Sequence, residues 1–173
     1  MNMIEAIEPR FSVPEQGSER ETLTGYLTFY RQTLVNKCAG LTFDQLTTRS
    51  VPATNMTLLG LIRHAVTAEQ HWFERIMPGN KVTWKFISRE DQDGDFDDLE
   101  SHSLAEVMAI FEGTCAASDA EIAARDLDDL SIGDTHHGKV SLRWVLNHMI
   151  EEYARHCGHA DLIRQSIDGA TGY

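Results

Sequence analysis

Apolar residues recur at spacings of three and four in four long segments of the chain, which places them on one face of an α-helix. A serine or threonine opens each segment, and in two of them a glutamate three residues later completes a capping box for the free amides of a helix start. We find no alternating pattern typical of a strand. The sequence therefore predicts an all-α protein, a four-helix bundle, with helices at about 18–40, 57–77, 103–125 and 141–167.

The segments between these helices lack a helical period and are predicted to be loops. Residues 1–17 are expected to form a tail, and residues 18–173 a single domain. Residues 80–102 are rich in acidic side chains, which indicates a solvated loop. The run from Asp91 to Asp95 resembles a calcium loop, but its glycine is fourth rather than sixth and no glutamate stands at the twelfth position, which argues against calcium.

Composition and charge narrow the class of protein. The chain has 173 residues, 42% of them hydrophobic, and a net charge of −12. At this length a core forms without disulfides or a structural metal, so metal ligands inside it are expected to be functional. The negative charge disfavours nucleic acid and anionic membrane surfaces as partners, because both are themselves negative.

Cysteine usage and the start of the chain point to the cytoplasm. Cys38, Cys115 and Cys157 are odd in number and far apart, which is typical of reduced thiols. The first residues carry glutamates and lack the apolar stretch of a secretory signal. No apolar run approaches the roughly 20 residues of a membrane helix. We expect a soluble cytoplasmic protein.

The last predicted helix carries polar residues where its core-facing stripe should be apolar. Glu152 falls on the same face as Val145 and Ile163, and His156 follows one turn later. An ionised carboxylate among apolar side chains costs several kcal/mol unless it is paired, hydrogen-bonded or bound to a cation. A carboxylate and an imidazole on adjacent turns can share a metal, with a third ligand from another helix. The second helix offers His64, and His71 two turns later.

A structural interpretation stays open beside the metal site. His148 and His159 also lie near this stripe, so the cluster could be a hydrogen-bonded core network or the lining of a water-filled groove. Glu69 falls inside the apolar stripe of the second helix, and it needs a partner that the sequence does not identify.

Several other side chains have both a functional and an ordinary interpretation. The His136-His137 pair is expected in a solvated loop, with the mouth of a cavity as the alternative. Three arginines are expected on helix surfaces, although each could meet a substrate carboxylate. Cys157 lies on the far flank of its helix and is not expected to be a nucleophile. The arginines are Arg63, Arg143 and Arg155, and the side chains expected to pack are Trp144 and Tyr153.

Two blocks of sequence, residues 56–77 and 142–172, closely resemble the mini-circle protein family. That family is a branch of the DinB-like superfamily, which also includes mycothiol-dependent maleylpyruvate isomerase and bacillithiol transferases. The resemblance extends over residues 19–172, nearly the whole chain. It implies a four-helix bundle with an up-down-down-up order and a long crossover.

The resemblance also implies a set of metal ligands. Superfamily members hold a divalent metal, commonly zinc or nickel, with one histidine of the second helix and two residues of the last. His64, Glu152 and His156 match these positions, with the E-x-x-x-H pair of the mycothiol-dependent isomerase in place of the more common H-x-x-x-H. His148, His159 and His71 are candidates for the pocket or the shell around the ligands. Two imidazoles and one carboxylate suit zinc, nickel or non-haem iron, and three protein ligands leave a position open for chemistry.

Three functions follow from this resemblance and from the residues. The first is a metal-dependent transferase or isomerase that uses a low-molecular-weight thiol such as mycothiol, with a small-molecule thiol or electrophile as partner. The second is a thiol-independent hydrolase in which the metal activates water. The third is a non-catalytic ligand-binding or interaction bundle. Many relatives pair through helix faces, so a homodimer is one expected assembly, although no isolated apolar stripe requires it.

Overall fold

The computed structural model describes residues 3–172, and it is built from α-helices. The long elements are α1 (Glu19–Cys38), α3 (Leu58–Glu69), α4 (Leu104–Ala123) and α5 (Leu142–Asp168). A π-helix, η1 (Gln70–Ile76), continues α3 directly. Among the described residues only isolated β-bridges occur, without a strand. The all-α prediction is confirmed.

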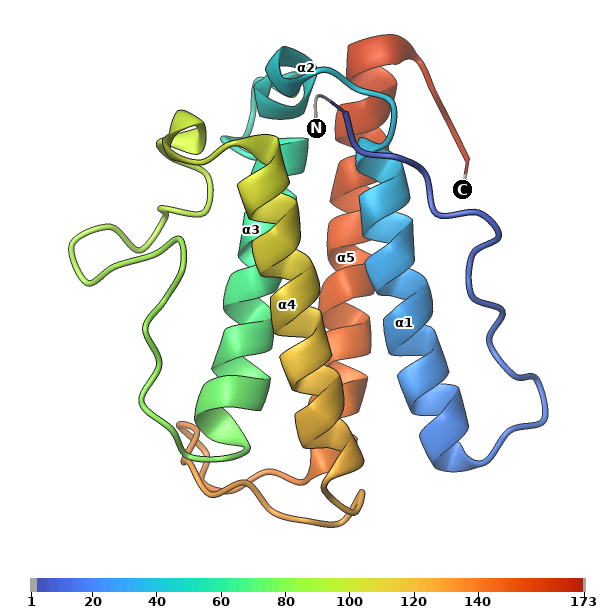
Figure 1. Cartoon of the computed structure of the whole chain (residues 1–173), viewed down its shortest axis with the longest axis vertical. Helices are drawn as coiled ribbons and strands as arrows, with labels where there is room; N and C mark the ends of the chain where they lie inside the picture. Colours follow the sequence, from blue (N-terminus) through green and yellow to red (C-terminus); the bar gives the residue numbers. More distant parts are fainter. Residues whose placement is uncertain (1–2, 173) are drawn as a thin grey trace.

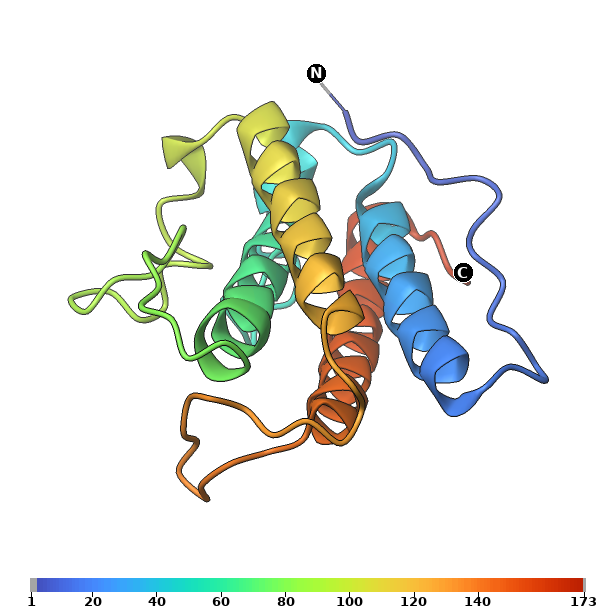
Figure 2. The same cartoon turned by 60° about the horizontal axis from the view of Figure 1, so that its bottom comes forward.

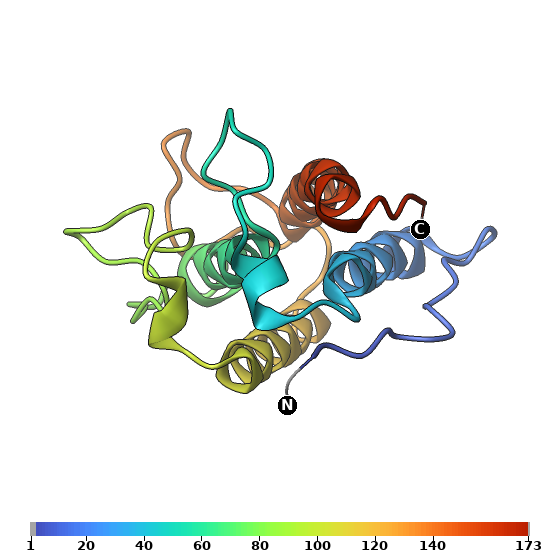
Figure 3. The same ribbon diagram turned by 90° about the horizontal axis from the view of Figure 1, so that it is seen from above.

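The four long helices lie side by side, as Figure 1 shows. α1 and α5 run in one direction, and α3 and α4 run in the other. α1 packs mainly against α5, and α3 against α4, while α5 also contacts α3. Seen from above, α5 lies between α3 and α1 (Figure 3). This arrangement brings the inward faces of α3 and α5 together, which is where the candidate site lies.

Capping residues fix the ends of the long helices where the sequence predicts them. The Ser18–Glu21 and Ser103–Glu106 capping boxes are both complete. Ser141 caps α5, which ends at Gly169 in the left-handed region with φ of 78°. The predicted boundaries are therefore confirmed to within a few residues, because local hydrogen bonds of these side chains stop or start the helix.

Two short helices lie in segments predicted to be loops. They are α2 (Phe43–Thr47) and the 3₁₀ helix η2 (Leu99–Ser101). α2 begins at a third capping box, formed by Thr42 and Gln45, and its Leu46 is fully buried. Five residues are too few to show a helical period, so the hydrophobic pattern misses such an element.

The acidic segment between η1 and α4 is not solvated throughout. Phe86 and Asp95 are buried, and the guanidinium of Arg63 donates hydrogen bonds to the carbonyl oxygens of Gly94 and Asp98. The expectation of a uniformly solvated loop is wrong at these positions, because a buried cation on α3 holds the segment against the helix. The same contact corrects the surface position expected for Arg63.

The segment before α1 lies along that helix rather than apart from it (Figure 1). Ile4 is buried in the core, and the Asn36 side chain hydrogen-bonds both the N–H and the carbonyl of Ile7. The loop between α4 and α5 hangs below the end of α3, which Figure 2 brings forward. Among the residues that the structure describes, no helix is long and apolar enough to span a bilayer.

Candidate metal centre

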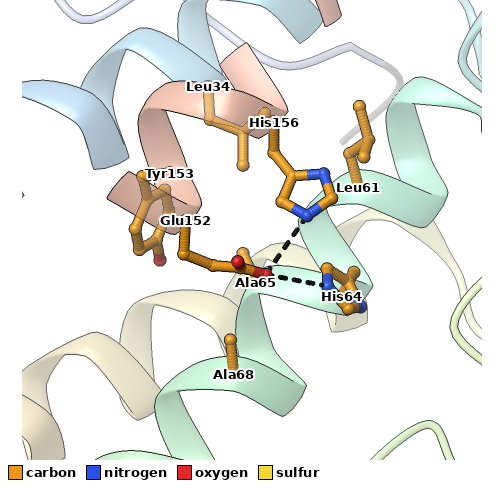
Figure 4. A pocket seen from close by; sticks show the side chains of 8 residues that line it. All are labelled: Leu34, Leu61, His64, Ala65, Ala68, Glu152, Tyr153 and His156. Atoms are coloured by element: carbon orange, nitrogen blue, oxygen red, sulfur yellow. Dashed lines mark hydrogen bonds and ion pairs between the residues drawn. The ribbon is translucent and has the colours of Figure 1, made fainter. Parts of the chain in front are cut away.

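Three side chains from two helices converge between α3 and α5. The Nε2 atoms of His64 and His156 lie 3.3 and 3.2 Å from the same oxygen, Oε1 of Glu152. One donor atom from each of the three lies within 4.8 Å of the others. Figure 4 shows the carboxylate of Glu152 reaching between the two imidazoles. The structure thus brings together the three residues that the sequence singled out.

The helices place these groups by register. Glu152 and His156 are four residues apart on α5, so they lie on adjacent turns of one face. His64 comes from the neighbouring helix α3. The small side chains of Ala65 and Ala68 line the pocket beside it, together with the aliphatic walls of Leu34 and Leu61. The Glu152 side chain is 22% exposed, and the cavity beside it has a volume of about 10 Å³, which is room for about one water molecule.

Asp95 fixes the orientation of His64 from outside the triad. Its Oδ2 lies 3.0 Å from His64 Nδ1, and its Oδ1 accepts a hydrogen bond of 2.7 Å from the Thr67 hydroxyl. The ring of Phe96 stacks on the same imidazole at 5.7 Å. A carboxylate on the outer nitrogen of a histidine sets which nitrogen is free to bind a metal. Asp95 therefore leaves Nε2 of His64 directed at Glu152.

Glycine at position 60 leaves room for the ring of Phe96 to pack against the backbone of α3. A Cβ built there would lie 2.4 Å from the ring of Phe96, closer than real contacts allow. The residue next to Asp95 can therefore pack directly onto the backbone of α3. Sequence reasoning missed Asp95, because nothing in its pattern separates it from the acidic residues around it.

His159 has the corresponding position on the other imidazole. Its Nδ1 lies 3.3 Å from Nδ1 of His156, one turn earlier on α5. Two ring nitrogens at this distance share one proton, so His156 can donate through Nδ1 and keep Nε2 free on the Glu152 side. Burial and the neighbouring His156 lower the pKa of His159, which favours the neutral ring needed as acceptor. Of the three surrounding histidines expected from the sequence, this one contacts the triad.

The protonation of the triad follows from its contacts. Burial disfavours the charged form of His64, but hydrogen bonds to Asp95 and Glu152 outweigh it and raise its pKa to about 9. Hydrogen bonds from His156 and then His64 lower the pKa of Glu152 well below its usual range. The carboxylate is ionised at neutral pH and is compensated by a proton, which a cation can replace.

The donor set fits a divalent metal. It combines one carboxylate oxygen with two imidazole nitrogens, the ligand types that zinc and nickel accept. Both outer ring nitrogens are occupied by Asp95 and His159, which is the second layer of contacts typical of metal-binding histidines. Three protein donors leave coordination positions for a further ligand, as in catalytic rather than structural sites.

The other two surrounding histidines lie away from the triad, His148 on α5 and His71 on η1. His148 stacks on Trp144 with ring centroids 5.1 Å apart, and it also meets the edge of Trp72 at 4.9 Å. His71 lines a separate pocket with His136, about two turns of helix from His64. Burial, with Arg75 and His148 nearby, lowers the pKa of His71.

Glu69 has the partner that the sequence did not identify. Arg31 of α1 donates two hydrogen bonds of 2.8 Å to its carboxylate, and the hydroxyl of Tyr153 donates a third, also of 2.8 Å. All three side chains are buried. The expectation that Tyr153 packs is confirmed. Trp144, expected to pack as well, is 47% exposed and lines the pocket near His71.

The remaining arginines and the cysteines are engaged elsewhere. Arg143 pairs with Glu19 and Asp128, and Arg155 pairs with Glu151. Arg63 lies over the ring of Phe86, 4.7 Å from its centroid. Burial raises the pKa of each cysteine thiol to about 12, so none is ionised near neutral pH; they are Cys38, Cys115 and Cys157.

Comparison with protein families adds a further observation. Residues 22–169 match the family model described as mycothiol-S-transferase, which spans most of the chain. The chain belongs to the mycothiol-S-transferase family. This family is DinB-like, which agrees with the broader resemblance, whereas the narrower likeness to mini-circle proteins stays a prediction. The comparison with curated proteins found no match.

Proposed function

We propose that this member of the mycothiol-S-transferase family is a metal-dependent enzyme that joins mycothiol to an electrophilic small molecule. The convergence of His64, Glu152 and His156 beside a small, partly exposed cavity carries the proposal. Family membership supports the choice of thiol. The directions of the helices in Figure 1 support the DinB-like up-down-down-up bundle.

Nε2 of each imidazole and the carboxylate of Glu152 would hold the ion, with zinc as the first choice and nickel as the second. Such an ion, when bound, lowers the pKa of a thiol beside it so that the thiolate is available near neutral pH. Asp95 and His159 keep the two rings in the tautomers that this requires. The aliphatic walls formed by Leu34 and Leu61 exclude water from one side of the reacting sulfur.

The nucleophilic sulfur comes from the substrate rather than from the chain. Every cysteine of the protein has a pKa raised to about 12 by burial, which leaves its thiol protonated and unreactive. In the reaction the sulfur of mycothiol forms a bond to the electrophilic carbon, and the leaving group departs with its electron pair. The thiol proton passes to solvent.

A conjugation assay tests this function. Zinc-loaded and nickel-loaded protein is mixed with mycothiol and monochlorobimane, and the thioether is followed by fluorescence and mass spectrometry. We expect conjugation faster than the spontaneous reaction, and loss of the acceleration in Glu152→Gln. Glu151→Gln is the matched control for the loss of a carboxylate on α5, because Glu151 pairs with Arg155, reaches His148 and contacts none of the three candidate ligands.

Two outcomes would contradict the proposal. If conjugation proceeds only at the spontaneous rate with either metal, the protein is not a transferase for this class of electrophile. Hydrolysis of ester or amide substrates that requires metal but ignores added thiol would favour the hydrolase instead.

A further inference from the structure

A second pocket lies beside η1 and the start of α5, and it shares no lining residue with the cavity at the metal centre. Its volume is about 510 Å³, and it lies between η1, the loop before α5 and the first turn of α5. Its lining combines two tryptophans with polar side chains of η1 and of the loop before α5. The lining residues used in the argument are Trp72, Trp144, His71, His136 and Arg75.

Backbone hydrogen bonds hold this pocket in shape. Ile132 and Gly133 donate their N–H groups to the carbonyls of Met77 and Ile76 at 2.9 and 2.8 Å, so the loop is attached to the end of η1. A Cβ at Gly133 would lie 2.9 Å from the carbonyl oxygen of Ile76, so only glycine permits this approach. π-Helical segments often mark functional sites, and this one carries both His71 and Trp72. The pocket is therefore formed before any ligand arrives.

The lining combines aromatic surface with hydrogen-bonding side chains, which suits a polyhydroxylated ring. The indoles of Trp72 and Trp144 have centroids 5.3 Å apart at 57°, which presents aromatic surface to the C–H face of a ring. The imidazoles of His71 and His136 can exchange hydrogen bonds with ring hydroxyls, whereas the Thr135 hydroxyl already donates to the Gly138 carbonyl and accepts from the His137 N–H. Lys139 is paired with Asp134, and Arg75 is the other permanent cation of the lining, which is fewer than the cluster of cations typical of a phosphate site.

The pocket and the metal centre share one ridge of α5. Trp144, His148, Glu152 and His156 follow each other at intervals of four residues, which places them along one side of the helix. His148 bridges the interval, since it stacks on Trp144 and precedes Glu152 by one turn. The eight residues from Trp144 to Glu152 correspond to about 12 Å along the helix axis. An extended small molecule of that length spans the interval.

We propose that this pocket binds the polyol end of the thiol substrate while the sulfur lies at the metal centre. Mycothiol has the required form, because its N-acetylcysteine is joined to a pair of polyhydroxylated rings. The inference rests on the proposed function for the placement of the sulfur. It adds a specificity site in which Trp144 recognises the sugar-like rings rather than the reacting atoms.

Calorimetric titration of the zinc-loaded protein tests the pocket. Mycothiol is compared with N-acetylcysteine, which lacks the rings, and with glucosaminyl-inositol, which lacks the thiol. We expect mycothiol to bind more tightly than N-acetylcysteine, and Trp144→Ala to weaken mycothiol about tenfold, a loss of roughly 1.4 kcal/mol. Trp144→Phe should restore most of the affinity. Tyr26→Ala, which removes an aromatic ring of similar exposure on α1, should bind like the wild type.

The outcomes separate the pocket from the proposed function. Binding of glucosaminyl-inositol that persists in Glu152→Gln and is lost in Trp144→Ala supports the pocket, even if the protein conjugates nothing. Equal affinity for mycothiol and N-acetylcysteine, or unchanged mycothiol affinity in Trp144→Ala, would overturn the pocket even if conjugation is observed. Failure of glucosaminyl-inositol to bind the wild type would overturn it as well.

Discussion

Two carboxylates interrupt the apolar faces of the helices, and their surroundings differ in kind. Glu69 is fully buried and receives three hydrogen bonds, two from the permanently charged Arg31 and one from Tyr153. Glu152 is 22% exposed and is shared by two histidines, whose charge depends on protonation. The charge of a carboxylate that is paired with a permanent cation is already compensated, so the carboxylate needs no metal. One with exchangeable protons around it, beside a pocket, can bind a metal instead.

Removal of Glu69 should have the largest effect on stability. Glu69→Ala leaves the Arg31 guanidinium buried with only the exposed Asp119 as carboxylate partner, and we expect it to lower the free energy of unfolding by about 3–5 kcal/mol. Urea unfolding of the metal-free protein measures this. The double variant Arg31→Met, Glu69→Leu should recover much of the loss, because neither charge is then buried alone. A single variant as stable as the wild type would show that Glu69 is not structural.

Substitution of Asp95 should weaken metal binding at the Glu152 site and leave the Arg31–Glu69 pair intact. Asp95→Asn keeps the size of the side chain but weakens the hold on His64 Nδ1, and we expect zinc affinity to fall by about 10–100-fold. Competition with a chromophoric chelator measures the dissociation constant. Asp97→Asn is the control, since that exposed carboxylate pairs with Arg49 instead. Equal zinc affinity in both variants would exclude Asp95 as the positioning residue.

The stability of the metal-free protein should depend on pH through His64, which contacts Glu152. The pKa of His64 is about 9 in the folded chain and 6.5 in the reference state, so its contribution to stability is complete below pH 6.5. Between pH 6.5 and 9 the folded state binds more protons than the unfolded state, and this contribution is lost as the pH rises.

Urea unfolding with a chelator present, at several pH values, measures this loss. His64→Asn should show a shallower decline in stability than the wild type across that range. If stability falls with pH at the same slope in the wild type and in His64→Asn, the contacts with Glu152 and Asp95 do not stabilise the protonated form of His64. Added zinc should reverse the trend for the wild type, because metal binding needs the neutral imidazole.

Much of the fold could be predicted because its signals are local. The serines at positions 18, 103 and 141 each act on the amides of the next turn, so their sequence context suffices. α2 was missed because a five-residue helix has no period to detect. η1 was missed as a π-helix because its i→i+5 bond, from Met77 N–H to the Trp72 carbonyl, leaves no mark in the hydrophobic pattern.

Only the part of the candidate site that lies on a single helix could be predicted from the spacing of polar residues. Glu152 and His156 share one face of one helix, so their spacing alone predicts that they meet. The choice of His64 as their partner came from the resemblance, since His71 lies at nearly the same angle. Asp95 and Arg31 come from distant segments, and their roles depend on packing that no spacing encodes.

The metal content of the protein tests the central claim, that Glu152 belongs to a metal centre and Glu69 does not. Untagged protein purified without chelator is analysed by plasma mass spectrometry, beside Glu152→Gln and the control Glu151→Gln. We predict about one zinc or nickel per chain in the wild type and in the control, and none in Glu152→Gln. An equal metal content in all three proteins, or no metal in the wild type with a melting temperature that zinc does not raise, would contradict it.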